Sequence, residues 1–334
     1  MLPVSSALEA LRAEHYNACV THVRPVNPGL RILRVQGDHP FRFVPGQYAV
    51  LGLLDAEPSL EAIGYAAHAP RPAGEQDRPP HVIKRAYSIS ARMLDDLGRL
   101  VRTTDEPWLE FYVTLVPESP SHPPGLTPRL FALRPGDRLL LGSHAHGHYT
   151  LRPVGSQDDV VFCATGTGEA PHNAMLTELL ARGHRGRIAS LTSVRYRVDL
   201  AYLETHRALE QRYANYRYLP LTTREPANLD PADPGFVGKQ YLQEWIAAGG
   251  LEREAGIRPS PERTQIYLCG SPQMIGLPRR AAGGSVQFPH PPGMVETLAA
   301  LGLDLDAPGR PGRVHVEQYW ATADPAAEAP PARA

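Results

Sequence analysis

Residues 159–168, DVVFCATGTG, give the strongest indication of the fold of the second half of this chain. Five apolar residues follow Asp159 without interruption, which is typical of a strand buried on both faces of a parallel sheet. Pro171 can then open a helix that runs to Leu180, and Gly183 is placed to end it. A glycine-rich turn between a strand and a helix gathers backbone N–H groups at the positive end of the helix, where a pyrophosphate would bind. A plain strand-to-helix turn would explain the same residues, so this stretch alone does not establish a dinucleotide site.

Downstream of this stretch, apolar strands alternate with helix-like segments. Strands are expected at residues 188–194, 216–221 and 265–269, and helices at 200–213 and 240–248. This alternation predicts an α/β domain with a parallel sheet, in which ligands bind at the carboxyl ends of the strands. We therefore expect an α/β domain over residues 153–320. The Ala/Pro-rich residues 321–334 are expected to form a disordered tail.

Upstream of residue 153 the sequence has the character of a β domain. Alternating or β-branched runs occupy residues 30–35, 47–51, 111–116 and 138–141, and Pro- and Gly-rich turns separate them. Short strands divided in this way predict an antiparallel β-barrel over residues 1–152. Residues 55–80, rich in Ala, Pro and Gly, are expected to form a surface insertion.

Composition argues against several classes of protein. The 334 residues carry 34 Lys+Arg against 35 Asp+Glu, which gives no sign of a nucleic-acid-binding surface. Cys19, Cys163 and Cys269 lie far apart, so neither a disulfide framework nor an iron–sulfur or zinc ligand set is indicated. The first residues lack the pattern of a secretory leader, and no apolar run approaches the roughly 20 residues of a membrane span. We expect a soluble cytoplasmic protein without a bound metal, and a monomer, although the sequence leaves the oligomeric state open.

Two further motifs place chemically useful side chains at strand ends. Arg85-Ala86-Tyr87-Ser88 offers an arginine for a phosphate, a tyrosine on the same strand face for a flat ring, and a serine hydroxyl for the edge of that ring. A half-buried strand with an exposed arginine would explain this motif equally well. Cys269-Gly270 ends an expected strand at the carboxyl edge of the sheet, where ligands bind in such folds. A buried structural cysteine is the commoner fate of such a residue.

Five motifs follow one another along the chain. They are FVPGQY at residues 43–48, RAYS at 85–88, GTGEAP at 166–171, CGSPQM at 269–274 and VEQYW at 316–320. In this order they resemble the motifs of the ferredoxin/flavodoxin–NADP(+) reductase family, from about residue 34 to residue 320, and the aromatic ending is more similar to its bacterial branch. The resemblance implies two domains: an N-terminal antiparallel β-barrel that binds FAD and a C-terminal α/β parallel-sheet domain that binds NADP(H).

The resemblance also implies which residues contact FAD. Arg85 would hold the pyrophosphate, Tyr87 would stack on the isoalloxazine, and Ser88 would lie near its N5 atom. A Gly-x-x-Ser/Thr turn normally completes the phosphate site, but Pro124-Gly125-Leu126-Thr127 has its glycine displaced by one position. Tyr319 would stack on the flavin and Trp320 on the adenine, or the reverse. The full set implied for FAD is Arg85, Ala86, Tyr87, Ser88, Tyr112, Val113, Thr114, Gly125, Leu126, Thr127, Tyr319 and Trp320.

For NADPH the resemblance implies a pyrophosphate cradle at the glycine-rich turn and basic residues for the 2′-phosphate. No acidic residue stands where a ribose 2′-OH partner would end the second strand of the domain, which favours NADPH, although arginines at strand ends are common. Glu169 occupies a place that is usually apolar in the family, and its carboxylate should weaken pyrophosphate binding unless it points away. The set implied for NADPH is Thr165, Gly166, Thr167, Gly168, Arg195, Arg224, Lys239, Gly270 and Met274.

The catalytic residues implied by the resemblance are Ser88, Cys269, Glu317 and Tyr319. Cys269 would stand beside the nicotinamide, and Glu317 or Ser88 would handle the flavin proton. The expected activity is exchange of electrons, through FAD, between NADPH and a one-electron carrier such as ferredoxin or flavodoxin. Such carriers are acidic, so we expect a basic rim at the docking site. Two alternatives stay open: an NAD(P)H-dependent flavin, quinone or oxygenase-component reductase, and a non-catalytic nucleotide-binding regulatory subunit.

Overall fold

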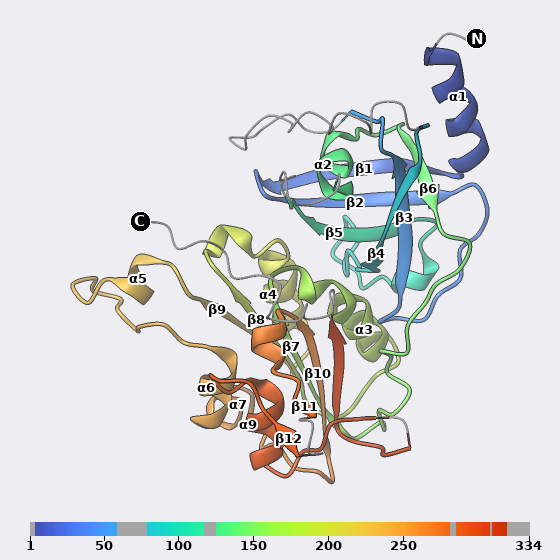
Figure 1. Ribbon diagram of the computed structural model, residues 1–334. Helices are drawn as coiled ribbons and strands as arrows, with labels where there is room; N and C mark the ends of the chain where they lie inside the picture. Colours follow the sequence, from blue (N-terminus) through green and yellow to red (C-terminus); the bar gives the residue numbers. More distant parts are fainter. Residues whose placement is uncertain (1–3, 59–78, 117–124, 281–284, 308, 319–334) are drawn as a thin grey trace. The chain divides into compact units, whose positions relative to one another are not determined.

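An antiparallel sheet of six strands forms the first part of the computed structural model, which describes residues 4–58, 79–116, 125–280, 285–307 and 309–318. Its strand order is β4-β3-β6-β1-β2-β5. A bridge between Ser90, two residues after the end of β4, and Glu110 of β5 connects the two edges of the sheet, which closes into a barrel (Figure 1). Its strands are β1 (Ala18–Asn27), β2 (Leu30–Gly37), β3 (Tyr48–Leu54), β4 (Val82–Ser88), β5 (Leu109–Thr114) and β6 (Arg138–Leu141).

The four strands predicted in this half are confirmed, with differences of a few residues at their ends. Strand β1 is not among the predicted strands, because its residues do not keep a regular alternation. Its register against β2 shifts between Val20 and His22 and again between Pro25 and Asn27, and such irregularities remove the period-two signal. Of the predicted insertion at 55–80, residues 59–78 lie outside the described part of the chain.

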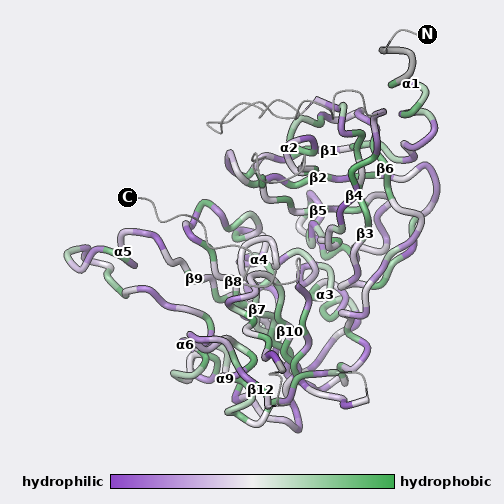
Figure 2. The backbone as a smooth tube through the Cα atoms, in the orientation of Figure 1, coloured by the Kyte–Doolittle hydropathy of each residue, from purple (hydrophilic) through white to green (hydrophobic). Residues whose placement is uncertain are grey.

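A parallel sheet of five strands forms the second part, in the order β13-β10-β7-β8-β9. Apolar residues, green in Figure 2, run through its central strand β7, which is buried nearly along its whole length. Apolar side chains from four helices pack against β7, β8 and β10 in one hydrophobic core; the helices are α6 (Leu242–Ala247), α7 (Gly250–Ala255), α8 (Pro272–Ile275) and α9 (Met294–Ala300). The predicted fold class is thereby confirmed. The strands are β7 (Asp159–Thr165), β8 (Ile188–Val194), β9 (Tyr216–Thr222), β10 (Thr264–Gly270) and β13 (Val314–Gln318), with a separate pair β11 (Arg279–Arg280) and β12 (Val286–Gln287).

Helices connect these strands, and the three predicted from the sequence are confirmed as α3, α4 and α6. A 3-10 turn, Gly166–Gly168, precedes α3 directly. No helix among the described residues is long and apolar enough to cross a membrane. The helices are α1 (Val4–His15), α2 (Leu126–Ala132), α3 (Glu169–Ala181), α4 (Leu203–Arg212), α5 (Pro226–Leu229), α6 (Leu242–Ala247), α7 (Gly250–Ala255), α8 (Pro272–Ile275) and α9 (Met294–Ala300).

The chain divides into two compact units that are not two consecutive stretches of sequence. Unit 1 contains the described residues up to Pro153 together with Ala170–His184 and Ala201–Ala208. Unit 2 contains Val154–Glu169, Arg185–Leu200 and the described residues from Leu209 onward. Most of α3 and the start of α4 therefore belong with the barrel, although they lie in sequence among the strands of the parallel sheet.

Candidate functional site

The Arg85-Ala86-Tyr87-Ser88 motif forms the end of β4, at one edge of the barrel sheet. Arg85 and Ala86 are exposed, Tyr87 is half-buried, and Ser88 is 6% exposed. The ring of Tyr87 lies edge-on to Phe111, with 6.5 Å between ring centroids. Burial raises the pKa of Tyr87, so its phenol stays protonated. An exposed guanidinium and a half-buried ring on one strand fit a ligand that has both a phosphate and a flat ring.

The turn Phe43-Val44-Pro45-Gly46-Gln47-Tyr48 lies beside this motif and requires glycine. Gly46 has a φ of 102°, and a Cβ at this position would lie 1.9 Å from the carbonyl oxygen of Tyr149. The Gln47 carbonyl accepts a hydrogen bond from Ile89 N at 3.0 Å, directly after the RAYS motif. The turn therefore holds the end of β4 in place.

The other implied FAD residues are mostly buried or half-buried. Val113 and Leu126 are buried in the barrel core, and Tyr112 is 5% exposed, whereas Thr114 is exposed. Thr127 Oγ1 accepts a hydrogen bond from Val116 N at 2.8 Å and donates to Val116 O at 3.1 Å. Gly125 is the N-cap of α2. A phosphate at this turn would thus meet the backbone N–H groups at the start of α2.

In unit 2 the glycine-rich turn packs against the carboxyl end of β10. A Cβ on Gly168 would lie 2.2 Å from Cys269 O, and a Cβ on Gly270 would lie 2.2 Å from Thr165 Oγ1. Gly270 also has a φ of 129°. Thr165 Oγ1 accepts a hydrogen bond from Ser271 N at 2.7 Å. Two strand ends can approach this closely only because both glycines lack side chains.

The glycine-rich turn also has open space beside Gly166. Gly166 has a φ of 53°, and no atom outside its own turn lies within 4 Å of the position that its Cβ would take. Thr167 beside it is half-buried. Open space over a turn at the start of α3 fits a pyrophosphate, which such turns bind through their N–H groups. Met274, by contrast, packs its side chain into the core of unit 2.

The carboxylate of Glu169 is engaged within unit 2. Its Oε1 accepts hydrogen bonds from Thr192 Oγ1 at 3.0 Å and from Tyr218 Oη at 2.8 Å. Glu169 is 2% exposed, and burial together with this carboxylate raises the pKa of Tyr218, which keeps the proton it donates. One carboxylate oxygen is thus directed at side chains of β8 and β9, which is the orientation that limits repulsion of a pyrophosphate.

Cys269 and Glu317 are adjacent in the sheet, at paired positions of β10 and β13. The Cys269 thiol is fully buried, and Glu317 is half-buried. Burial raises the pKa of Glu317 to about 7. A carboxyl group with such a pKa can both donate and accept a proton near neutral pH. Two of the implied catalytic residues therefore lie side by side. Tyr319 and Trp320 lie outside the described residues.

Two of the implied phosphate-binding residues also lie together, at the carboxyl ends of β8 and β9. Arg224 N donates a hydrogen bond to Arg195 O at 2.9 Å, and both side chains are exposed. The neighbouring carboxylate of Glu225 accepts a hydrogen bond from Arg197 N at 2.5 Å, so one of its oxygens is directed at the backbone. Exposed Lys239 follows Gly238, whose carbonyl accepts from Asn228 Nδ2 at 3.1 Å.

Sequence reasoning missed a buried polar network around Ser90. Its partners Tyr202 and Asn173 are 112 and 83 residues away along the chain. No local pattern could reveal these partners, because each stands in an ordinary helical or turn sequence. The one available signal was the position of Ser90, two residues after Ser88.

Comparison with known proteins supports the implied relationship. A family model described as the oxidoreductase NAD-binding domain matches residues 162–279. A flavodoxin/ferredoxin–NADP reductase of Shigella flexneri is 31% identical over 194 residues, covering 58% of this chain and 69% of that protein. The phenol 2-monooxygenase reductase component DmpP of a Pseudomonas species is 27% identical over 262 residues, covering 78% of this chain and 60% of that protein. A crystal structure of a ferredoxin NADP+ reductase from Neisseria gonorrhoeae with bound FAD and NADP has the same fold, with a TM-score of 0.65 at 20% identity over 92% of this chain and 99% of that one.

Proposed function

The chain belongs to the flavodoxin/ferredoxin–NADP reductase family, and on that premise we propose that it exchanges electrons between NADPH and a one-electron carrier such as ferredoxin or flavodoxin. It is an NAD(P)H-dependent flavoprotein reductase with FAD and NADP(H) as cofactors. The observation that carries the proposal is the pairing of Cys269 with Glu317, a carboxyl group whose pKa burial raises to about 7, at the carboxyl edge of a nucleotide-binding sheet.

We assign FAD binding to residues 1–152. Arg85 would hold the pyrophosphate, Tyr87 would cover the isoalloxazine, Ser88 would face its reactive edge, and the start of α2 would contribute backbone N–H groups. Tyr319 and Trp320 would cover the ring systems of the bound cofactor. When bound, FAD accepts two electrons as a hydride and passes them on one at a time.

We assign NADP(H) binding to residues 153–320. The open turn Gly166–Gly168 would bind the pyrophosphate through its N–H groups, and Arg195, Arg224 and Lys239 would surround the 2′-phosphate. The buried Cys269 side chain would limit water beside the nicotinamide. Glu317 would hold or release the proton that accompanies electron transfer. We expect the protein to act as a monomer in the cytoplasm.

The decisive experiment measures reduction of the purified, FAD-loaded protein by NADPH and by NADH in a stopped-flow instrument. We expect rapid bleaching of the flavin absorbance with NADPH, and slower bleaching with NADH at equal concentration. Replacing Arg195 and Arg224 together by Ala should raise the KM for NADPH by roughly tenfold or more, since charge-assisted phosphate contacts are lost, and leave the KM for NADH nearly unchanged.

Arg253→Ala provides the matched control, because this exposed arginine lies on α7 and pairs with Glu254. It should leave both KM values as they are. A protein that remains colourless with FAD, or whose bound flavin neither nucleotide reduces, would contradict the proposal.

A second candidate function is the reductase component of an oxygenase. The similarity to the phenol 2-monooxygenase reductase component over 78% of this chain favours it. The two candidates differ in the acceptor, so the reduced protein should be mixed with ferredoxin, with flavodoxin and with an oxygenase component. Fast electron transfer to the acidic small carriers supports the first candidate, and transfer only to the oxygenase supports the second.

A further inference from the structure

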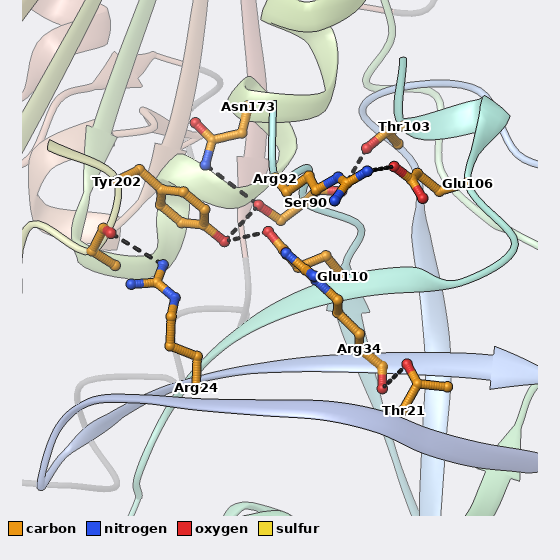
Figure 3. Close-up of polar contacts among 11 residues, drawn as sticks. Thr21, Arg24, Arg34, Ser90, Arg92, Thr103, Glu106, Glu110, Asn173 and Tyr202 are labelled. Carbon is orange, nitrogen blue, oxygen red and sulfur yellow. Dashed lines mark hydrogen bonds and ion pairs between the residues drawn. The ribbon is translucent and has the colours of Figure 1, made fainter. Parts of the chain in front are cut away.

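A buried polar network begins two residues after the RAYS motif, in unit 1 (Figure 3). The Ser90 hydroxyl lies 3.1 Å from the Tyr202 hydroxyl and accepts a hydrogen bond from Asn173 Nδ2 at 3.3 Å. Tyr202 Oη donates to Glu110 Oε1 at 2.9 Å, and Arg34 Nε donates to the second carboxylate oxygen at 2.9 Å. The four residues Ser90, Asn173, Tyr202 and Glu110 are at most 2% exposed. A buried network of this kind specifies one arrangement of its members.

The hydrogen bonds of this network have a fixed direction. Tyr202 has one hydroxyl hydrogen, and it is hydrogen-bonded to the Glu110 carboxylate. The Ser90 hydroxyl must therefore be the donor in its hydrogen bond to the Tyr202 oxygen. Burial and the neighbouring carboxylate raise the pKa of Tyr202 well above its ordinary value. The tyrosine therefore keeps its proton at any pH at which the protein would be studied, and every donor points toward the carboxylate.

The network joins the two strands that are proposed to bind FAD. Ser90 follows Ser88 by two residues, and Glu110 precedes Tyr112 by two. Ser90 N also donates to Glu110 O at 2.8 Å, and Thr103 Oγ1 donates to Ser90 O at 3.2 Å. The backbone and the hydroxyl of Ser90 are thus both held, which fixes where β4 ends.

A strained residue lies just beyond this point. Met93 is fully buried and has a φ of 64°, in the left-handed region that a side chain of this size rarely adopts. The adjacent Arg92 lies over the Trp108 ring at 5.5 Å and pairs with Glu106 at 2.7 Å. Strained backbone persists where the surrounding contacts over-determine it, and it gathers at ligand-binding segments.

We propose that Tyr202 is a positioning residue for FAD, because its bond to Ser90 fixes the segment that carries Tyr87 and Ser88. This inference rests on the proposed function, in which that segment binds the flavin. The Tyr202 ring is itself held, edge-on to Tyr112 at 5.5 Å and beneath the guanidinium of Arg24 at 5.7 Å. Removing only the hydroxyl should therefore leave the ring in place and take away the acceptor of the Ser90 hydroxyl, while the backbone bonds of Ser90 remain.

The chain contains a matched control with the same chemistry. Tyr16 Oη donates to Glu57 Oε1 at 2.8 Å, and Arg12 donates to the same carboxylate at 2.8 and 2.7 Å. Tyr16→Phe and Tyr202→Phe thus each remove a tyrosine hydroxyl from a glutamate that an arginine also holds. Each hydroxyl also accepts a second hydrogen bond, Tyr16 from Leu54 N at 2.8 Å and Tyr202 from the Ser90 hydroxyl at 3.1 Å. The two variants therefore differ in the segment that loses this bond, which is the end of β3 for Tyr16 and the continuation of β4 for Tyr202.

The experiment compares the full-length wild type, Tyr202→Phe and Tyr16→Phe, by titrating apoprotein with FAD and following flavin fluorescence. Both variants should lower the thermal midpoint by a similar amount. The Kd for FAD should rise about tenfold in Tyr202→Phe, since the loss of one buried hydrogen bond is felt at the binding segment, and change less than about twofold in Tyr16→Phe. The absorbance bands of the bound flavin should shift in Tyr202→Phe alone.

Ser90 provides the second test, which also applies if Tyr202→Phe fails to fold. Ser90→Ala removes the other end of the bond and should weaken FAD binding to the same extent, and the double variant should be no weaker than either single one. Ser90→Thr keeps a hydroxyl and should bind FAD like the wild type. Equal Kd values in Tyr202→Phe and Tyr16→Phe, or additive effects in the double variant, overturn the inference and leave the proposed function intact. A wild type that binds no FAD overturns both.

Discussion

Glu317 shows how burial can bring the pKa of a single carboxyl group close to neutral pH. Loss of hydration raises its pKa, because a half-buried carboxylate is less well solvated than a free one. The result is a carboxyl group that titrates at about 7 at the carboxyl edge of the parallel sheet, beside Cys269.

The raised pKa of Glu317 predicts a specific dependence of stability on pH. The folded state holds this proton up to about pH 7, whereas the unfolded chain releases it at the ordinary, lower pKa. Glu317 therefore contributes stability at low pH that is lost as the pH rises through about 7. We expect Glu317→Gln to flatten the fall in free energy of unfolding between pH 5 and pH 8, measured by urea unfolding.

Glu254→Gln is the control for this experiment, because Glu254 is an exposed carboxylate on α7. It should keep the wild-type slope. If Glu317→Gln keeps that slope too, the pKa of Glu317 is not raised in the folded protein. In the FAD-loaded protein, the rate of NADPH oxidation should fall above about pH 7 in the wild type and be low and flat in Glu317→Gln.

At the scale of elements, the junction of β7, the glycine-rich turn and β10 depends on missing side chains. The expected strand–turn–helix order was read correctly from residues 159–180, because apolar runs and helix-opening proline are local signals. The sequence could not show that Gly168 packs against the backbone of Cys269, or that Gly270 packs against Thr165. Both contacts join segments that are about 100 residues apart in the chain.

Gly270→Ala should therefore be strongly destabilising. Its φ of 129° disfavours any side chain, and the new Cβ would meet Thr165 Oγ1 at 2.2 Å. Gly183→Ala is the matched control, because Gly183 also has a positive φ, of 68°, but open space around its Cβ position. We expect a loss of about 1 kcal/mol in free energy of unfolding for Gly183→Ala, and of more than about 3 kcal/mol for Gly270→Ala. Equal losses, measured by urea unfolding, would show that crowding at the strand ends is unimportant.

At the scale of the whole molecule, two separate hydrophobic cores divide the part that we propose to bind FAD from the part that we propose to bind NADP(H). The barrel core includes β1 to β6, and the other core includes β7, β8, β10 and helices α6 to α9. A ligand that binds only the folded form of one part slows the opening of that part.

Amide hydrogen exchange, read by mass spectrometry, tests this assignment. FAD should slow exchange at residues 85–90 and 109–116, and NADP+ should slow exchange at 165–168, 195 and 224. NAD+ serves as the matched control: it should protect residues 165–168 but not 195 and 224, because it has no 2′-phosphate. Protection of 165–168 by FAD alone, or equal protection of 195 and 224 by NAD+, would contradict the assignment.

Local patterns were enough to predict the class of each half, the order of most strands and the positions of the five motifs, because hydrophobic period, turn residues and motif spacing are properties of neighbouring residues. Other features follow only from the packing of the folded chain. This packing placed Tyr202 and Asn173 on Ser90, directed Glu169 at Tyr218, and set Cys269 beside Glu317. Each of these pairings joins residues that are distant in sequence. The hydrogen bonds of Ser90 and Glu169 and the raised pKa of Glu317 therefore depend on the folded structure. The assignment of α3 and the start of α4 to the barrel unit has the same origin, since packing and not chain order decides which residues share a compact unit.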